Sequence, residues 1–279
     1  MTVSVVVPTF NGEPWIRDQL AALSEQTYAG RWELIIADNG STDDTKSIAT
    51  GWADRFPSLR ILDASGGRGP MHNRNQGALA ASSDVLLFTD ADDIVCPTWI
   101  AQLTDGLRDS PIVTGPFVHF VDRRTPRWDE VPASQVRPPP GPFEPLIGCN
   151  MGIVREVLFD LGGFDETSPV GWDDTDLAVR ATSRGIKIAW IERAIVLRRR
   201  PSSARAMWRK EFNYGRGWTM LERRYPQLAP NGWVRPLLRR ARWVSVRVPY
   251  VAIPTRRRAW VARAASLAGR LVEHVRPPG

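Results

Sequence analysis

The sequence predicts an α/β fold with a mostly parallel sheet, because apolar runs of strand length alternate with helical patterns through the first half of the chain. Residues 3–7 and 34–37 are runs of branched and other apolar side chains, and each run ends in a turn. Residues 13–26 between them carry apolar side chains near helical spacing. A strand, a helix and a second strand in this order form a parallel crossover unit.

A further strand-length run, residues 85–88, leads almost directly into three carboxylates, Asp90, Asp92 and Asp93. Carboxylates at the end of a buried strand repel one another and raise the cost of folding unless a cation or hydrogen-bond donors offset it. Ligand sets made only of oxygen favour Mg²⁺ or Mn²⁺, which keep positions open for the oxygens of a substrate diphosphate. The alternative is a solvated acidic turn before the next helix.

Two other segments carry groups suited to a nucleoside or a phosphate. Asp38 ends the second predicted strand, where open α/β sheets place ligands, whereas Asp43 and Asp44 fit the first turn of the following helix. Residues 66–77 are glycine-rich, lead into a short helix and include two arginines, one of them Arg74. Backbone amides freed by glycine next to arginine suit a phosphate, and a surface loop is the alternative.

Later in the chain, residues 162–166 (Gly-Gly-Phe-Asp-Glu) and 171–177 (Gly-Trp-Asp-Asp-Thr-Asp-Leu) add a glycine turn and an acidic helix start. Taken in order, these segments resemble an inverting glycosyltransferase of family 2 with the GT-A fold. The resemblance covers roughly residues 3–225 and rests on the ordered set of motifs. It implies a GT-A-type three-layer domain with a mostly parallel sheet.

The resemblance also implies which residues bind a nucleotide-sugar donor. Asp38 would accept a hydrogen bond from the imide N–H of the base, and Arg74 and Asn75 would close over the donor. Asp92 would be the principal ligand of a divalent metal, Mn²⁺ or Mg²⁺, and Asp90 would contact the ribose or the metal. The implied donor-binding residues are Pro8, Thr9, Phe10, Asn11, Asp38, Arg74, Asn75, Asp90 and Asn150.

The catalytic carboxylates implied by the resemblance are Asp173 and Asp174, which stand where the family usually has Glu-Asp. Asp174 would be the general base that takes the proton of the acceptor hydroxyl, and Asp173 would orient the acceptor. Asp176 is expected at the surface. The alternative is that the dipole of the following helix alone favours acids at its start.

One position departs from the family pattern. Many relatives carry a histidine metal ligand where this chain has Arg198, and the histidines here are His72, His119 and His274. A guanidinium cannot coordinate a metal, because it has only donors and stays protonated. We expect the metal to be held mainly by Asp92 and the diphosphate, and the alternative is a diphosphate partly neutralised by arginine.

Composition agrees with a soluble α/β enzyme. The 279 residues are 43% hydrophobic, which is enough to bury a full core in one domain with an appendage. The two cysteines, Cys96 and Cys149, imply no disulfide framework. Because no long uncharged apolar stretch is present, we expect a cytoplasmic protein without a membrane span.

The net charge of +7 conceals an asymmetry along the chain. Residues 1–197 carry 17 basic and 27 acidic side chains, and residues 198–279 carry 20 and 3. Residues 226–279 are predicted to form a basic, mainly helical extension in which tryptophan interleaves with arginine. This composition suits an anionic membrane surface on the cytoplasmic side. An ordinary helical subdomain is the alternative, and nucleic acid is a weak candidate because its usual motifs are missing.

The predicted function is transfer of a sugar from a nucleoside diphosphate sugar, with UDP or dTDP favoured, to a hydroxyl of a glycan or lipid-linked saccharide in polysaccharide or cell-envelope synthesis. The domain would span residues 1–225, with a nucleotide-binding half (1–120) and an acceptor half (121–225). A proline-rich loop, 132–145, would lie over the site between the two halves and shape acceptor choice, and the alternative is that it merely connects strands. A sugar nucleotidyltransferase is a first alternative, although residues 8–12 do not resemble its signature. A non-catalytic module that binds membranes or nucleic acid is a second.

Overall fold

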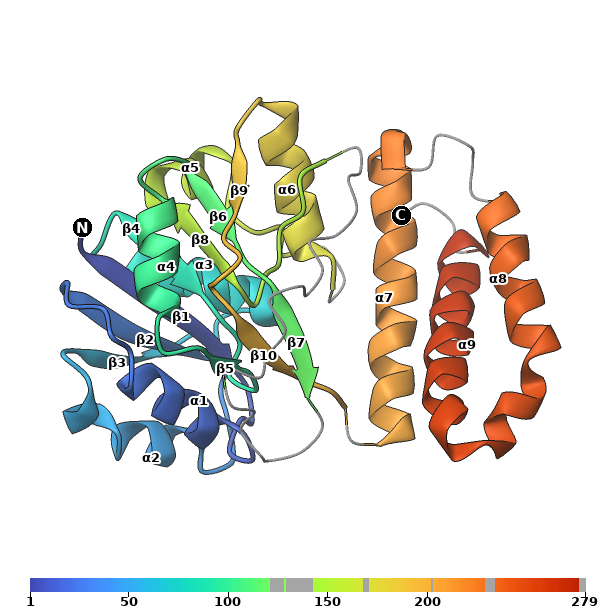
Figure 1. The fold of residues 1–279 in the computed structure, drawn as a ribbon, viewed down its shortest axis with the longest axis horizontal. Helices are drawn as coiled ribbons and strands as arrows, with labels where there is room; N and C mark the ends of the chain where they lie inside the picture. Colours follow the sequence, from blue (N-terminus) through green and yellow to red (C-terminus); the bar gives the residue numbers. More distant parts are fainter. Residues whose placement is uncertain (121–127, 129–142, 168–170, 202, 229–233, 276–279) are drawn as a thin grey trace. The chain divides into compact units, whose positions relative to one another are not determined.

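The structure is a computed structural model that describes residues 1–120, 128, 143–167, 171–201, 203–228 and 234–275. It divides into two compact units (Figure 1). The first, which we call the α/β unit, comprises Met1–Glu166 and Asp173–Arg199. The second, the helical unit, comprises Thr167–Trp172 and Arg200–Gly279. Most of the proline-rich loop predicted at 132–145 lies outside the described residues.

Strands and helices alternate through most of the α/β unit, as the sequence predicts. Its elements in chain order are β1 (Val3–Thr9), α1 (Ile16–Ser24), β2 (Trp32–Asp38), α2 (Thr45–Thr50), η1 (Ala53–Arg55), β3 (Leu59–Asp63), α3 (Pro70–Ala80), β4 (Val85–Phe88), β5 (Ile94–Val95), α4 (Trp99–Gly106), β6 (Ile112–Thr114), β7 (Phe117–Phe120), β8 (Met151–Val154), α5 (Arg155–Asp160), α6 (Asp173–Ser183), β9 (Ile188–Trp190) and β10 (Val196–Arg199).

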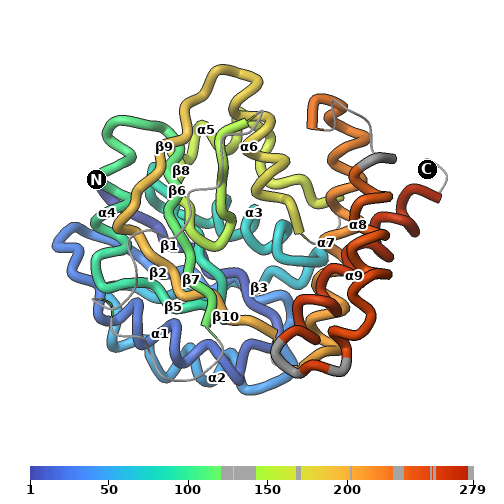
Figure 2. Tube along the Cα trace, turned by 45° about the vertical axis from the view of Figure 1, so that its right-hand side comes forward, coloured from blue at the N-terminus to red at the C-terminus, as the bar shows by residue number. Residues whose placement is uncertain are grey.

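The strands form a seven-stranded sheet in the order β3-β2-β1-β4-β8-β6-β9 and a smaller sheet in the order β5-β10-β7 (Figures 1 and 2). The first four strands of the large sheet run parallel to one another, and β6 runs parallel to β9. β8 runs antiparallel to both β4 and β6. The prediction of a mostly parallel sheet is therefore confirmed.

Two hydrophobic clusters cover the opposite faces of the large sheet. Successive residues of a strand point to opposite faces, and β1 accordingly sends Val5 to one cluster and Val6 to the other. The Val5 cluster includes side chains of α1, α2 and α4, and the Val6 cluster includes side chains of α3, α5 and α6. A helical layer on each side of the sheet gives the three-layer architecture that the sequence predicts.

The contact of α3 with β1 depends on a glycine. A Cβ built on Gly77 of α3 would lie 2.3 Å from a methyl group of Val6. Only glycine therefore lets the helix approach the strand this closely. The close approach holds α3, which carries Arg74, directly on the strand that ends at the candidate site.

The helical unit consists of α7 (Ala204–Arg224), η2 (Pro226–Leu228), α8 (Val234–Val246), η3 (Val248–Ala252) and α9 (Pro254–Val275). α7 and α9 pack at glycines: a Cβ on Gly215 would lie 2.1 Å from the Ser266 carbonyl oxygen, and one on Gly269 would lie 2.0 Å from that of Phe212. This packing groups α7 with the helices that follow it. The boundary between the units lies after Arg199, whereas the sequence suggested a boundary after residue 225.

Two ion pairs, one of them buried and the other partly buried, reinforce the contact of α7 with α9. Arg216 Nε lies 2.9 Å from Glu273 Oε2, and Arg270 Nη1 lies 3.2 Å from Glu222 Oε1. Across the described residues, each helix is too short or too polar to serve as a membrane span.

Candidate active site

The carboxyl ends of β1, β2 and β4 carry the polar side chains from which the site is built. β1 ends at Thr9, which pairs with Asp38 at the end of β2. β4 ends at Phe88, two residues before Asp90. Parallel strands of one sheet end at the same edge, so these segments come together where the sequence predicts the nucleotide and the metal.

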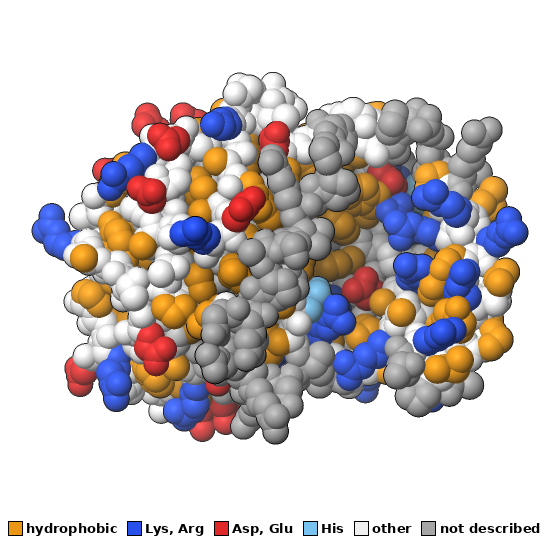
Figure 3. Space-filling view, viewed as in Figure 1, with side chains coloured by type: hydrophobic (Ala, Val, Ile, Leu, Met, Phe, Trp, Pro, Cys, Tyr) orange, Lys and Arg blue, Asp and Glu red, His pale blue; other side chains and the backbone are white. Residues whose placement is uncertain are grey.

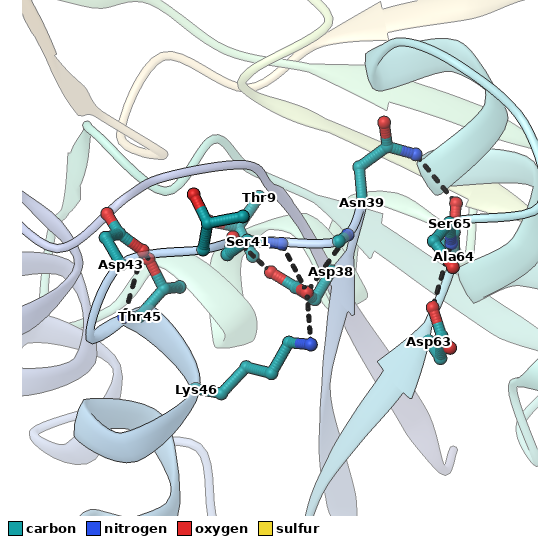
Figure 4. A network of polar contacts seen from close by, with 12 residues as sticks. Thr9, Asp38, Asn39, Ser41, Asp43, Thr45, Lys46, Asp63, Ala64 and Ser65 are labelled. Atoms are coloured by element: carbon teal, nitrogen blue, oxygen red, sulfur yellow. Dashed lines mark hydrogen bonds and ion pairs between the residues drawn. The ribbon is translucent and has the colours of Figure 1, made fainter.

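Asp38 organises the turn that follows β2 (Figure 4). Its side chain is fully buried, and Oδ2 accepts hydrogen bonds from the backbone N–H groups of Gly40 and Ser41 at 3.1 and 3.0 Å. Oδ1 accepts from the Ser41 hydroxyl, and Lys46 Nζ lies 3.4 Å from Oδ2. These contacts occupy the carboxylate. The structure thus gives Asp38 a structural role and does not present it to a base, in contrast to the expectation from the sequence.

The next residue, Asn39, was missed by sequence reasoning. Its Nδ2 donates to the carbonyl oxygens of Ala64 and Gly67 and to Asn73 Oδ1, at 2.7, 3.0 and 2.7 Å. Asn73 is buried on α3 and donates in turn to carbonyl oxygens at the ends of β1 and β2, at 3.1 and 3.0 Å. Asn39 Oδ1 points away from the Ala64 contact in Figure 4 and is the amide atom suited to accept from a ligand.

The loop after β1 contains four of the residues predicted to hold the nucleoside. Pro8 and Thr9 are buried at the end of the strand. Phe10 is 61% exposed, and Asn11 is exposed in a left-handed conformation with φ of 50°. Asn11 Oδ1 accepts a hydrogen bond from the backbone N–H of Thr42 at 2.9 Å, which ties this loop to the turn after β2. Phe10 and Asn11 are thus the members of the set that are open to a ligand.

Arg74 is buried at the centre of the site and bridges two carboxylates. Nη2 lies 2.7 Å from Asp90 Oδ1, and Nη1 lies 2.5 Å from Asp173 Oδ2. Burial lowers the pKa of Arg74, but Asp90 and Asp173 outweigh it and raise that pKa above its usual range. The positive charge is therefore permanent. One arginine joins the acidic segment after β4 to the start of α6.

Asn75 supports the glycine turn that follows α5. Its Nδ2 donates to the Phe164 carbonyl oxygen at 2.9 Å and to Glu166 Oε1 at 2.7 Å, and its Oδ1 accepts from the Phe164 N–H at 2.9 Å. Gly163 has φ of 72°, and a Cβ there would lie 2.9 Å from Asn75 Oδ1. These contacts use both atoms of the amide. Asn75 thus fixes the turn at 162–166, and its contact with the donor stays a prediction.

The carboxylates after β4 do not share one environment. Asp92, predicted as the principal metal ligand, is exposed, whereas ligand atoms of Asp90, Asp93 and Cys149 lie within 4.8 Å of one another and could hold a metal ion. Burial, with the charges of Asp92 and Asp90, raises the pKa of Asp93 well above its usual value. Asp93 Oδ2 is buried without a hydrogen-bond partner among the described residues. A carboxylate in this state suits a proton or a cation as its partner.

The chemistry of this group fits a hard divalent cation. Burial, together with the charge of Asp93, raises the pKa of the Cys149 thiol well above its usual value, and sulfur is a softer ligand than Mg²⁺ or Mn²⁺ prefers. The two carboxylates are the ligands that Mg²⁺ or Mn²⁺ prefers. Arg198 of β10 lies over the Phe117 ring, 5.2 Å from its centroid, and its charge lowers the pKa of Asp93. Arginine thus adds positive charge beside the acidic group.

Asp174 lies in the first turn of α6 and is half-buried. Its Oδ2 accepts a hydrogen bond from the backbone N–H of Gly148 at 2.9 Å, and its Oδ1 accepts from that of Thr175 at 2.7 Å. A Cβ on Gly148 would lie 3.5 Å from Asp174 Oδ2 and 3.6 Å from Arg74 Nη2. The backbone at Gly148 therefore lies beside both groups, and the candidate base belongs to the same site as the arginine bridge.

Asn150 and Asp176 lie in surroundings other than those predicted. Asn150 is fully buried: Oδ1 accepts from Trp99 Nε1 at 2.8 Å, and Nδ2 donates to two backbone carbonyl oxygens at 2.8 and 2.7 Å. It holds loops together instead of lining a donor sugar. Asp176, expected at the surface, is fully buried and pairs with Arg180 at 2.7 Å.

The comparison with known families gives the identity of this fold and site. The sequence model described as "Glycosyl transferase family 2" matches residues 4–158, more than half of the chain. The chain belongs to glycosyl transferase family 2. The family resemblance drawn from the motifs is thereby confirmed, and the protein is a glycosyltransferase.

Curated relatives of this glycosyltransferase are also named glycosyltransferases. "Probable glycosyltransferase YdaM" of Bacillus subtilis is 25% identical over 241 residues, which cover 77% of this chain and 54% of the relative. "Glycosyltransferase AglE" of Haloferax volcanii is 27% identical over 222 residues, covering 77% and 72%. The chain thus spans about half the length of the Bacillus relative.

Solved structures of glycosyltransferases share the fold. A mannosyltransferase from Pyrobaculum calidifontis, in complex with GDP-Man and Mn²⁺, matches with a TM-score of 0.70 and 21% identity, over 98% of this chain and 87% of that one. S. aureus TarS residues 1–349, in complex with UDP, match with a TM-score of 0.55 and 19% identity, over 98% and 90%. The GT-A-type fold predicted from the motifs is confirmed.

Proposed function

We propose that this glycosyltransferase moves a sugar from a nucleoside diphosphate sugar, with UDP or dTDP as the favoured carrier, to a hydroxyl of a glycan or lipid-linked saccharide, with inversion. The observation that carries the proposal is the bridge made by Arg74. It joins Asp90, beside the acidic group, to Asp173, beside the candidate base. Groups for a leaving diphosphate and for an attacking hydroxyl are thus held in one rigid cluster.

Asp174 is the proposed general base. As the acceptor oxygen bonds to the anomeric carbon, the bond from that carbon to the diphosphate oxygen breaks, and its electron pair leaves with the diphosphate. The hydroxyl proton passes to Asp174. The Gly148 N–H orients the carboxylate, and the start of α6 favours its charged form before the transfer. Attack from the face opposite the leaving group gives inversion.

Asp90 and Asp93 are proposed to hold a divalent metal, with Asp92 reaching it from the exposed loop. A bound Mg²⁺ or Mn²⁺ would neutralise charge on the leaving diphosphate. Two observations on this chain support the site: the close grouping of ligand atoms and the unpartnered Asp93 Oδ2. Arg198 is proposed to supply additional positive charge there, since a guanidinium stays protonated.

The nucleoside is proposed to lie on the loops after β1 and β2. The exposed Phe10 ring offers an apolar surface for a base, and Asn39 Oδ1 can accept a hydrogen bond from the imide N–H of uracil or thymine. This assignment moves base recognition from Asp38 to its neighbour. It keeps the prediction of UDP or dTDP.

Comparisons with known proteins support a nucleotide-linked donor and a lipid-linked acceptor. An Escherichia coli relative named "UDP-Glc:alpha-D-GlcNAc-diphosphoundecaprenol beta-1,3-glucosyltransferase WfgD" is 32% identical over 100 residues, covering 36% of this chain and 37% of the relative. The Pyrobaculum calidifontis and S. aureus structures carry GDP-Man and UDP, respectively. A cytoplasmic location remains a prediction from the sequence.

A nucleotide panel tests the donor assignment. We expect UDP or dTDP with Mn²⁺ to raise the melting temperature, because a ligand that binds the folded state stabilises it, and GDP, CDP and ADP to raise it less. An unchanged melting temperature with every nucleotide would contradict the donor site. Release of nucleoside diphosphate during turnover, instead of pyrophosphate, would separate this activity from a sugar nucleotidyltransferase.

The Asp174→Asn variant tests the base. Once a donor is known, we expect turnover to fall by about 10²–10⁴-fold because no group takes the hydroxyl proton, while the nucleotide-induced rise in melting temperature persists. Asp54→Asn in η1 is the matched control, since it makes the same exchange at an exposed position. Turnover of Asp174→Asn near that of Asp54→Asn would remove Asp174 from the mechanism.

A further inference from the structure

The helical unit carries more arginine than its carboxylates can neutralise. Residues 234–275, which form α8, η3 and α9, contain ten arginines and one acid, Glu273. Glu273 is turned toward α7, where it pairs with Arg216 at 2.9 Å. Figure 3 shows Lys and Arg side chains interleaved with hydrophobic ones on the visible face of this unit. The segment from α8 to α9 therefore has a strongly positive surface.

Apolar and basic side chains share the outer face of α8. Leu238 and Val246 are 64% and 66% exposed, and Arg239 and Arg242 are also exposed. The spacing of three, four and seven residues places these side chains on one face of the helix. The opposite side of α8 includes the buried Leu237.

The connection between α8 and α9 extends this exposed apolar surface. Val248, Val251 and Ile253 are 53%, 37% and 40% exposed. A connection made of glycine or polar residues would avoid the cost of leaving three branched apolar side chains in water. Their position at the end of a helical hairpin, next to a basic helix start, is typical of a surface that is covered by a partner.

Arginines near this connection are held on aromatic rings. Arg247 lies 5.0 Å from the centroid of Trp243 and 5.9 Å from that of Tyr250. Arg256 lies 4.9 Å from the Tyr250 centroid, and Arg263 lies 3.9 Å from the Trp243 centroid. Stacking leaves the guanidinium charged, with its N–H donors directed along the edge of the group, so it remains able to bind a phosphate.

We propose that α8, η3 and the start of α9 bind the surface of an anionic phospholipid bilayer. Val248, Val251 and Ile253 enter the boundary between headgroups and acyl chains, and Arg239 and Arg242 contact lipid phosphates. A bilayer surface takes apolar and basic groups together. Nucleic acid would satisfy the arginines but leave the branched side chains in water, so it fits this surface less well.

Flotation of the full chain with vesicles tests the proposal. We expect binding to vesicles of phosphatidylcholine and phosphatidylglycerol at about 7:3 in low salt, with little binding to pure phosphatidylcholine. Raising the salt to about 0.5 M should weaken binding, because salt screens exposed charges. No flotation with the anionic vesicles in low salt would overturn the proposal. Binding of a DNA duplex without vesicle flotation would overturn it in favour of nucleic acid.

Paired arginine variants locate the contact. Arg239→Gln with Arg242→Gln should reduce the vesicle partition coefficient by about fivefold for each arginine lost. Arg31→Gln with Arg108→Gln removes the same charge from exposed positions of the α/β unit and should have little effect. Equal losses in the two double variants would show that net charge alone attracts the protein, which would overturn the assignment to α8.

A fluorescent label at residue 248 tests insertion independently of charge. Cys96 and Cys149 are buried, so a polarity-sensitive fluorophore can be attached selectively to Val248→Cys. We expect its emission to shift to shorter wavelength with anionic vesicles, whereas the same label on Arg108→Cys stays unchanged. Vesicle binding without a shift at residue 248 would overturn the insertion of η3.

Discussion

The two units of the molecule arrange their charges in opposite ways. In the α/β unit, the arginine at the site, Arg74, is buried between Asp90 and Asp173. In the helical unit, two Arg–Glu pairs join α7 to α9 at 2.9 and 3.2 Å, but most arginines of α8 and the start of α9 are exposed. Charge is thus neutralised within the protein at one place and displayed at the other.

This difference predicts how each unit responds to substitution. A buried charge depends on its partner, so removing one member of a pair leaves the other without compensation and costs several kcal/mol. Exposed charges are screened by water and salt, and each contributes little to folding. Charge changes in the α/β site should therefore affect stability, whereas those on α8 should affect binding alone.

The largest effect is expected from Arg74→Leu. It leaves the carboxylates of Asp90 and Asp173 without their cation, and we expect it to lower the free energy of unfolding by about 3–5 kcal/mol. The loss of stability should become smaller at acidic pH, because protonation of Asp173 removes the repulsion between its carboxylate and that of Asp90. Urea unfolding at pH 7 and pH 4.5 measures both effects.

Arg60→Gln provides the matched control for Arg74. Arg60 pairs with Glu33 at 2.8 Å, but its side chain is about half-exposed, so the expected loss is below about 1 kcal/mol. If the two substitutions had equal effects at pH 7, or if Arg74→Leu were equally destabilised at both pH values, the bridge would not be the source of the stability.

Much of the α/β fold could be predicted because its first strands are long and uniformly apolar. β1 and β2 are buried on both faces, so their sequences are nearly continuous apolar runs. The order of the later strands could not be predicted, because β6 and β9 have three residues each and carry no pattern. The grouping of α7 with α9 depends on Gly215 and Gly269, whose partners lie far apart in the sequence.

The site was predicted best where a motif places several carboxylates together. Asp90, Asp173 and Asp174 interact electrostatically with Arg74, so these predicted site residues lie together, and their roles stay predictions. Asp38 and Asn75 occupy motif positions too, but hydrogen bonds within the protein use their side chains. A motif gives the position of a residue along the chain, whereas the direction of its side chain depends on neighbours that the sequence does not identify.

A smaller effect than that of Arg74→Leu is expected from Asp173→Asn, and it depends on pH. Burial raises the pKa of Asp173 from its usual 3.8 to about 6, because the effects of burial and nearby acids exceed that of Arg74. The folded state then binds this proton more tightly than the unfolded state. The contribution of Asp173 to stability is greatest below pH 3.8 and falls as the pH rises through 6.

Unfolding of Asp173→Asn at a series of pH values measures this contribution. The variant lacks the titrating group, so its stability relative to the parent should rise between pH 4 and pH 7, by at most about 3 kcal/mol. Asp54→Asn, at an exposed position, should follow the parent at every pH. A difference between Asp173→Asn and the parent that stays constant with pH would contradict the raised pKa.

The last stability effect that we predict comes from Gly215→Ala, which adds one methyl group to α7. The same exchange at a glycine of the α/β unit should change stability in the opposite direction or not at all. Alanine normally stabilises a helix relative to glycine by up to about 1 kcal/mol, but at Gly215 its Cβ would meet the Ser266 carbonyl oxygen at 2.1 Å. We expect Gly215→Ala to destabilise the helical unit by about 1–3 kcal/mol. Gly51→Ala, at the end of α2 in the α/β unit, has ordinary contacts of 3.5 Å and should be neutral or stabilising.

Hydrogen exchange resolved by segment measures where Gly215→Ala acts. We expect faster exchange in α7 and α9 alone. Faster exchange in β1 as well would mean that the two units do not unfold separately.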